Sequence, residues 1–343
     1  MTTVMSMNYP SFLKPNGTIG LFASSFGANT DPYKTRLIFA INRLQTMGFT
    51  VVQEGDIFGY YQGASASKEQ RALAFTSLYK NPDVDFLWSV GGGEWLMEIL
   101  PLIDFEELKH YPPKYVMGYS DNTHLTLLMN TLLDTASIYG QHTPEICREP
   151  WDDSLTQLME IITGNRTNQH SFPYYQAKEL VQMDPLEGYQ LTEKTKWMTF
   201  GDSKVSMKGR FIGGCLDVVL QHLGTSYDYV KTFIDRYQND GIVWFLEACD
   251  LNLFSLKRAL WQLKEAGWFK HTKGIIFGRH LNASPVIDLD QYQTTLDVLS
   301  DLSIPIIMDA DFGHIAPTFT LISGSYVEIE SANGEGSITM HLR

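Results

Sequence analysis

The stretch KYVMGYSDNTHLTLLMNTLLD, from Lys114 to Asp134, changes its pattern near the middle. Its first residues are apolar, β-branched or aromatic, which is typical of a buried strand, and this run stops at Gly118. Beyond Ser120 the apolar residues follow the 3.6-residue spacing of a helix. The stretch therefore predicts a strand, a sharp turn and a helix, which is the repeating element of a parallel α/β sheet.

Ser120 stands at this predicted turn, and two roles are open to it. Ligands of a parallel sheet gather beyond the carboxyl ends of its strands, so a serine there could be a nucleophile. The Asp121 amide, at the start of the helix, could then donate to an oxyanion. The arrangement is similar to the G-x-S-x-G elbow of α/β-hydrolases, although the second glycine is absent. Serine is also among the commonest helix N-caps, and this stretch alone favours the cap.

The rest of the chain extends the alternation of strand and helix. Short apolar runs such as TIGLFASS (18–25) and VDFLWSVGGG (84–93) alternate with helical patterns, which predicts a parallel sheet covered on both faces. We expect an N-terminal α/β domain over residues 1–168 and a connecting segment with an irregular aromatic loop over 169–205. A C-terminal mixed α/β domain over residues 206–343 should end in an antiparallel hairpin.

The composition narrows the classes of protein to consider. A chain of 343 residues is long enough for two domains. Its formal net charge of -13 argues against binding to nucleic acid or to an anionic membrane. We find no apolar run of membrane-spanning length and no secretory signal pattern, so we expect a cytoplasmic protein. The three cysteines, Cys147, Cys215 and Cys249, form neither a disulfide framework nor a C-x-x-C motif.

Three further features could serve a serine nucleophile. Three consecutive glycines, 91–93, follow a predicted strand. They can expose their amides to a ligand, although they could equally form a tight turn. Glu247 ends a very apolar strand, where an unpartnered carboxylate would be costly to bury, and Asp250 is a nearby substitute for it. His314 follows another strand, although a lone loop histidine is more often surface decoration. The order serine, acid, histidine is that of the α/β-hydrolases.

A metal site was weighed against this interpretation. Asp309, Asp311 and His314, together with His280, could offer oxygen and imidazole ligands. No H-x-x-x-H or H-E-x-x-H spacing supports such a site. We therefore expect no metal and no cofactor.

Several motifs carry a resemblance to a known family. They are GYSDNTHL, the glycine run before ILPLIDFEEL, GRFIGGCLDVV, FLEACD, GIIFGR and DADFGHIAPTFTLISGS, and together they span nearly the whole chain. This set resembles the LD-carboxypeptidase family of serine peptidases, and within it the branch of the microcin C immunity peptidases. The resemblance implies a flavodoxin-like or amidotransferase-like N-terminal domain, a smaller β-rich α/β C-terminal domain, a homodimer, and a Ser-His-Glu triad without a metal.

The resemblance also implies a role for individual residues. Ser120 in GYSD corresponds to the nucleophile, Glu247 in FLEA to the triad acid, and His314 in FGHIAP to the base. The oxyanion donors would be the amide of Asp121 and that of a glycine in VGGG. Within this glycine run, the spacing to ILPLID favours Gly93 as the donor, with Gly92 beside it.

Three positions bear on the substrate. Trp197 lies in the loop where the microcin branch carries a tryptophan that stacks on adenine, so it is the predicted substrate-binding residue. Cys215 stands where the family often has asparagine after its paired glycines. The segment ACDLN after Glu247 lacks the basic residue that would contact a nucleotide.

The predicted function is amide hydrolysis through an acyl-enzyme. The substrate would be a small molecule, either the L,D-amide of a muropeptide tetrapeptide or an aminoacyl-nucleotide of the microcin type. A non-catalytic α/β ligand-binding module is the alternative. A class I amidotransferase relative ranks lower, because that chemistry normally uses cysteine at the position of Ser120.

Overall fold

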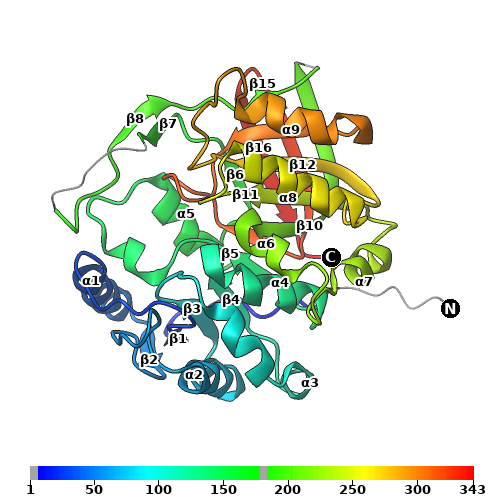
Figure 1. The fold of residues 1–343 in the computed structure, drawn as a ribbon. Helices are drawn as coiled ribbons and strands as arrows, with labels where there is room; N and C mark the ends of the chain where they lie inside the picture. The colour runs from blue at the N-terminus through cyan, green and yellow to red at the C-terminus, as the bar shows by residue number, and fades with distance from the viewer. Residues whose placement is uncertain (1–6, 178–183, 202) are drawn as a thin grey trace.

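The computed structural model describes residues 7–177, 184–201 and 203–343, which form two units with one large sheet each (Figure 1). The first sheet has the strand order β14-β5-β4-β3-β1-β2. Its strands are β1 (Thr18–Phe22), β2 (Thr50–Gln53), β3 (Phe86–Ser89), β4 (Tyr115–Gly118), β5 (Ser137–Tyr139) and β14 (Leu321–Ser323). All neighbours in this sheet are parallel except β14, which runs antiparallel to β5.

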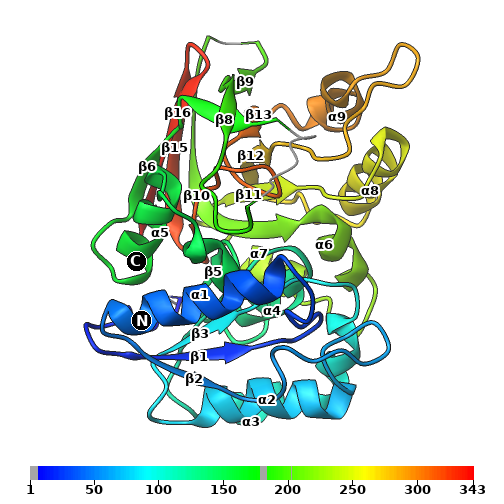
Figure 2. The same cartoon turned by 90° about the vertical axis from the view of Figure 1, so that its left-hand side faces the viewer.

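Helices cover both faces of the first sheet, with α1 on one face and α2 and α3 on the other (Figure 2). The helices of this half of the chain are α1 (Tyr33–Thr46), α2 (Lys68–Lys80), α3 (Phe105–Leu108), α4 (Thr123–Thr131) and α5 (Asp153–Ile162), with 3-10 helices η1 (Leu96–Leu102), η2 (Ser120–Asn122) and η3 (Thr143–Cys147). Strand residues alternate between the two faces, so that Trp88 packs in one core cluster and Leu87 in the other. Burial on both faces explains why these strands are apolar throughout.

Local sequence accounts for most of these elements. Ser67 caps α2 with a complete capping box, in which its hydroxyl accepts from the Gln70 amide and the Gln70 side chain accepts from the Ser67 amide. The predicted strand, turn and helix of residues 114–134 are present as β4, η2 and α4. Residues 96–102 form a 3-10 helix rather than an α-helix. Pro101 lies inside it and cannot donate an i→i−4 hydrogen bond.

The second sheet is mixed, with the order β6-β16-β15-β10-β11-β12-β13-β9. Its strands are β6 (Asn168–His170), β9 (Met198–Thr199), β10 (Lys204–Cys215), β11 (Ile242–Glu247), β12 (Thr272–Gly278), β13 (Ile306–Ala310), β15 (Tyr326–Ala332) and β16 (Glu335–His341). The accompanying helices are α6 (Leu216–His222), α7 (Val230–Arg236), α8 (Leu253–Glu265), α9 (Gln291–Leu299) and the 3-10 helix η4 (Ser300–Leu302). Strands β10 to β13 are parallel, and β15 and β16 form the predicted antiparallel hairpin.

The fold class predicted from the sequence, a parallel-sheet N-terminal unit with a mixed C-terminal unit, is confirmed. Part of the segment expected to be an irregular loop is more regular than predicted. It contains β6 and β9 of the second sheet and a separate antiparallel pair, β7 (Tyr174–Gln176) and β8 (Leu191–Lys194). Residues 178–183 of this loop lie outside the described residues.

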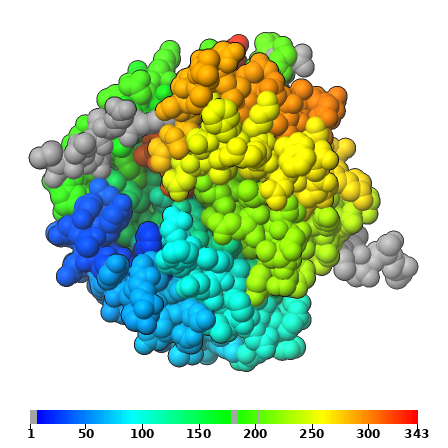
Figure 3. Space-filling view, in the orientation of Figure 1, coloured from blue at the N-terminus to red at the C-terminus, as the bar shows by residue number. Residues whose placement is uncertain are grey.

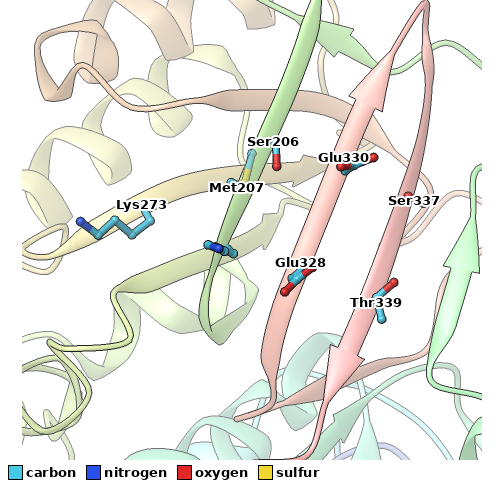
Figure 4. A pocket seen from close by; sticks show the side chains of 8 residues that line it. Ser206, Met207, Lys273, Glu328, Glu330, Ser337 and Thr339 are labelled. Carbon is cyan, nitrogen blue, oxygen red and sulfur yellow. The ribbon is translucent and has the colours of Figure 1, made fainter.

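One face of the second sheet is polar at its β10-β15-β16 end. Exposed and buried residues alternate along β10 and β15, as expected for a half-buried antiparallel pair. A shallow cavity of about 450 Å³ lies on this face, at the end of β10 remote from Cys215 (Figure 4). It is lined by Ser206, Met207, Lys208, Lys273, Glu328, Glu330, Ser337 and Thr339. Charges of both signs across neighbouring strands indicate a solvated sheet surface.

The two units are joined by elements that pass between them. All residues of α4 are buried, because it packs against β4 and β5 of the first sheet and β10 of the second. β14 comes from the C-terminal part of the chain and completes the first sheet. The surface is hollowed where the two units meet (Figure 3). Within the described ranges, no helix has the length and hydrophobicity to cross a membrane.

Candidate active site

The turn between β4 and α4 holds Ser120 in a strained conformation. Its backbone φ is +58°, in the left-handed region that non-glycine residues rarely adopt. No side-chain capping hydrogen bond is made at the start of η2 or of α4. Ser120 therefore does not act as a side-chain cap of either helix. Strain of this kind is typical of functional turns.

The residues after Ser120 tie this elbow to the glycine run. The Asn122 Nδ2 group donates to the Gly91 carbonyl at 2.8 Å, and the Asn122 Oδ1 atom accepts from Ser24 Oγ at 2.8 Å. The Asp121 carboxylate accepts from the Leu96 amide at 3.0 Å. These buried bonds fix the loop after β3 against the loop after β4.

Gly92 is the glycine of the run that faces Ser120. A Cβ atom built on Gly92 would lie 3.2 Å from Ser120 Cβ and 3.3 Å from Ser120 Oγ, so only a glycine leaves this approach open. Gly93 has a φ of +137° and faces Ser25 instead. Among the described residues, no group accepts a hydrogen bond from the amides of Gly92, Gly93 or Asp121. Unpaired amides beside a hydroxyl are the donors that an oxyanion requires.

Glu247 and His314 form a buried pair. Glu247 is the last residue of β11, and its side chain is fully buried. The His314 Nδ1 atom lies 2.8 Å from Glu247 Oε2. Gly313 permits this contact, because its φ is +105° and a Cβ atom there would lie 3.0 Å from the same carboxylate oxygen.

The charges of this pair stabilise each other. Burial alone would raise the pKa of Glu247, but the charge of His314 and the hydrogen bonds from His314 and Tyr139 outweigh it and lower that pKa. Burial would likewise lower the pKa of His314, but the charge of the Glu247 carboxylate, together with hydrogen bonding to Cys249 and Glu247, overcomes this and raises that pKa well above 6.5. Glu247 therefore holds the Nδ1 atom, which leaves the Nε2 atom of the imidazole for proton transfer.

Tyr139 is a member of this network that the sequence did not reveal. It ends β5, in the first unit, and its hydroxyl donates to Glu247 Oε1 at 2.5 Å. The Ser120 amide lies 3.5 Å from the same hydroxyl oxygen. Burial and the Glu247 charge raise the pKa of Tyr139 well above 10, so the hydroxyl stays protonated and donates. Tyr139 thus bridges Glu247 of one unit and the Ser120 turn of the other.

Ser120 and His314 line one cavity of about 730 Å³, together with Gly91 and Gly92. The remaining lining residues are Phe26, Gly27, Ala28, Asn29, Thr30, Tyr33, Tyr60, Ala64, Val90, Tyr119, His142, Pro144 and Glu145. A second, polar cavity of about 160 Å³ shares Tyr119, Glu145 and His314 with the first. His314 therefore stands at the junction of two cavities.

His142 is a second histidine in the large cavity, and no sequence pattern points to it. Its Nε2 atom lies 3.2 Å from both Asn122 Nδ2 and the Tyr119 carbonyl oxygen. Burial lowers the pKa of His142 to about 3, so the ring is neutral. His142 contacts Asn122 of the elbow. Among its described hydrogen-bond contacts, His142 has no carboxylate partner of the kind that raises the pKa of His314.

Trp197 does not lie with these residues. Its side chain is 1% exposed, and its indole Nε1 atom donates to Asp311 Oδ2 at 2.7 Å. The ring packs against Phe319, with the ring centroids 5.9 Å apart. In this position the indole is a packed part of the second unit, and it lines neither of the two cavities at His314.

The side chains weighed as metal ligands have separate partners. Asp309 binds Gln291 and Tyr292, Asp311 binds Arg279 and Trp197, and His280 contacts the Leu251 carbonyl. Across the described ranges, no three acidic, histidine or cysteine side chains converge as a metal site would need.

Comparison with known proteins places this chain in a family. Residues 19–140 match the model of the LD-carboxypeptidase N-terminal domain, and residues 208–329 match that of the LD-carboxypeptidase C-terminal domain. The chain belongs to the LD-carboxypeptidase family. The family resemblance expected from the sequence is thereby confirmed.

Relatives within the LD-carboxypeptidase family extend over nearly the whole chain. The microcin C7 self-immunity protein MccF of Escherichia coli is 26% identical, over 98% of each chain. A probable murein peptide carboxypeptidase of Bacillus subtilis is 24% identical, over 97% of this chain and 95% of its own length. A solved structure of MccF in complex with glutamyl sulfamoyl guanosine is 25% identical and superimposes with a TM-score of 0.80, covering 97% of this chain and 98% of that one.

Proposed function

We propose that this protein is a serine peptidase that hydrolyses an amide in a small peptide or aminoacyl conjugate through an acyl-enzyme. The observation that carries the proposal is the joint position of three groups. The strained Ser120 and the Glu247-bound His314 line the same cavity, and the unpaired amides of Gly92 and Asp121 flank the serine. Membership in a family of serine carboxypeptidases supports it.

In the proposed reaction, His314 Nε2 takes the proton from Ser120 Oγ as that oxygen attacks the carbonyl carbon. The Glu247 carboxylate holds the imidazole through Nδ1 and stabilises the imidazolium. The Gly92 and Asp121 amides donate to the tetrahedral oxyanion, and each such donor lowers the barrier by about 3 kcal/mol. His314 then protonates the leaving amine, and water releases the acyl group by the reverse sequence.

Two substrate classes fit the proposal. One is the L,D-amide of a muropeptide, as the name of the Bacillus subtilis relative suggests. The other is an aminoacyl-nucleotide, the class to which the ligand of the MccF complex is related. The buried position of Trp197 gives no support to adenine stacking by that residue.

The proposal is tested by assaying purified protein on a muropeptide tetrapeptide and on an aminoacyl-sulfamoyl adenosine. Ser120→Ala should abolish turnover of whichever substrate is cleaved, because no other described group replaces the nucleophile. Its melting temperature should match or slightly exceed that of the wild type, since the left-handed strain at this position persists and no capping bond is lost.

Ser226→Ala is the matched control, because this exposed serine lines neither cavity. The control should keep full activity. Normal hydrolysis by Ser120→Ala would show that Ser120 is not the nucleophile.

A further inference from the structure

The wall of the large cavity is aromatic and exposed. Phe26 is 44% exposed, Tyr33 is 56% exposed and Tyr60 is 74% exposed, and all three line the cavity that holds Ser120. Ala28, Ala64, Val90 and Pro144 complete the apolar lining. Large apolar side chains gathered at one cavity mark a binding surface, because leaving them in water is unfavourable.

Backbone hydrogen bonds hold this wall in place without a ligand. The loop after β1 and the loop after β2 are joined by a bond from the Ala28 amide to the Ile57 carbonyl at 2.8 Å. The Ser65 amide donates to the Ser25 carbonyl at 2.7 Å, and the Phe26 amide donates to the Gly92 carbonyl at 2.9 Å. The loop that carries Phe26 is thus fixed to the glycine run and to the loop after β2, so its backbone needs little further ordering when a ligand binds.

Among the described residues that line the cavity, two side chains can carry a charge near neutral pH, Glu145 and His314. None of its described lining residues is a lysine or an arginine. Glu145, the only carboxylate among the described lining residues, binds Arg148 and Tyr189 and lies 3.6 Å from Arg36. Although burial opposes it, these arginines lower the pKa of Glu145, so it stays ionised. Apart from the imidazole of His314, which Glu247 already pairs, the described lining offers an incoming carboxylate no cation and presents Glu145 and aromatic carbon instead.

The two cavities can be assigned to the two sides of the scissile amide. Ser120, Gly91 and Gly92 line only the large cavity, so the carbonyl and its acyl group belong there. His314 lines both cavities, and it protonates the leaving amine in the proposed reaction. The leaving group therefore points to the small polar cavity.

We propose that the acyl group of the substrate is a large apolar or aromatic amino acid residue, which packs against Phe26, Tyr33 and Tyr60. This inference rests on the proposed function. It separates the protein from the MccF complexes, whose bound ligands carry glutamyl or aspartyl groups.

The test compares acyl groups on a constant leaving group. Kinetics are measured on X–D-alanine dipeptides and on X-sulfamoyl adenosines, in which X is phenylalanyl, alanyl, aspartyl or lysyl. The phenylalanyl substrate should have a kcat/KM about 10- to 200-fold above the aspartyl substrate, the range that apolar pockets achieve. An aspartyl or lysyl substrate that equals or exceeds the phenylalanyl one would overturn the assignment.

Variants of the aromatic wall test whether its side chains cause the preference for the phenylalanyl substrate. Tyr60→Ala should lower kcat/KM about tenfold for the phenylalanyl substrate and less than about twofold for the alanyl substrate. Phe26→Ala should act in the same direction. Trp261→Ala is the matched control, because this tryptophan of α8 is 57% exposed and lines neither cavity. Equal losses on both substrates, or none, would contradict an aromatic acyl site.

The outcomes separate this inference from the proposed function. Hydrolysis of the alanyl or aspartyl substrate without a preference for phenylalanyl would overturn only the acyl assignment. Hydrolysis of none of these substrates by a protein whose Ser120 is inert to serine-directed reagents would overturn both.

Discussion

At the scale of single residues, the catalytic proposal depends on what surrounds Glu247. Both oxygens of this buried carboxylate are occupied, one by His314 and the other by Tyr139. A carboxylate that receives two hydrogen bonds is a weaker base than one that receives a single bond. Tyr139 therefore controls how strongly Glu247 raises the basicity of His314, and it is a positioning residue of the site.

Tyr139→Phe should shift the pH dependence of hydrolysis. Activity requires neutral His314, and its raised pKa places the acid limb of kcat/KM above pH 6.5, with activity increasing as the pH rises. Loss of the tyrosine hydroxyl makes the Glu247 carboxylate more basic. The more basic carboxylate then raises the pKa of His314 further, so that His314 keeps its proton to a higher pH. The limb should therefore move to higher pH, by up to about one unit.

Tyr115→Phe is the control for this shift. Tyr115 is a buried tyrosine of the neighbouring strand β4, and its hydroxyl has no partner in the described part of the chain. Tyr115→Phe should leave the acid limb of the kcat/KM profile at the same pH as in the wild type. If the activity of Tyr139→Phe falls but the acid limb of its kcat/KM profile stays at the wild-type pH, Tyr139 has only a structural role.

The residues also show what local sequence can and cannot predict. Ser120 could be found because a strand pattern stops just before it and a helix pattern starts just after it. Tyr139 could not, because a tyrosine in an apolar strand is typical of core, and its partner lies 108 positions away. Trp197 was expected in an aromatic loop, yet its indole donates to the buried Asp311 carboxylate. The residues that surround Trp197 in the sequence do not indicate this contact.

At the scale of elements, the site is built from the ends of strands. β3 supplies the glycine run, β4 the elbow, β5 Tyr139 and β11 Glu247. β3, β4 and β5 are parallel neighbours in the first sheet, so their carboxyl ends meet at one edge, as the sequence pattern leads one to expect. β11 belongs to the second sheet, and the pattern of strands does not predict that its end meets them. α5 was not predicted, although Asp152 caps it and its apolar residues have helical spacing. The surrounding polar residues obscured that pattern.

Gly92→Ala tests the close approach of two of these elements. The new methyl group would lie 3.2 Å from Ser120 Cβ and 3.4 Å from His142 Cε1, so the glycine run or the elbow must move by a few tenths of an ångström. We expect kcat to fall about tenfold or more, because small displacements of reacting groups are costly. The free energy of unfolding should change much less.

Gly91→Ala is the companion variant, since a Cβ atom at Gly91 would approach only the Phe26 carbonyl oxygen, at 3.3 Å. It should lose clearly less activity than Gly92→Ala. Equal activities of the two variants and the wild type would show that the Gly92 approach to Ser120 is not needed.

At the scale of the whole molecule, the proposed nucleophile and its base belong to different units. Ser120 comes from the first sheet, whereas Glu247 and His314 follow strands of the second. The two units are held together by α4 and by β14, which crosses from the second unit to the first. The sequence predicted both sheets but not this crossing. The homodimer that the family resemblance implies, and the division at residues 168 and 206, stay predictions.

The measurement that tests the central claim most directly is the labelling rate of Ser120 by a fluorophosphonate, followed by mass spectrometry of the modified peptide. The account predicts one adduct, on Ser120, and a rate that falls about 100-fold or more in His314→Gln, because a general base contributes at least that much. His341→Gln, a change at an exposed histidine, should label like the wild type. Labelling of Ser120 that is no faster than that of Ser226, or that is unchanged in His314→Gln, would contradict the account.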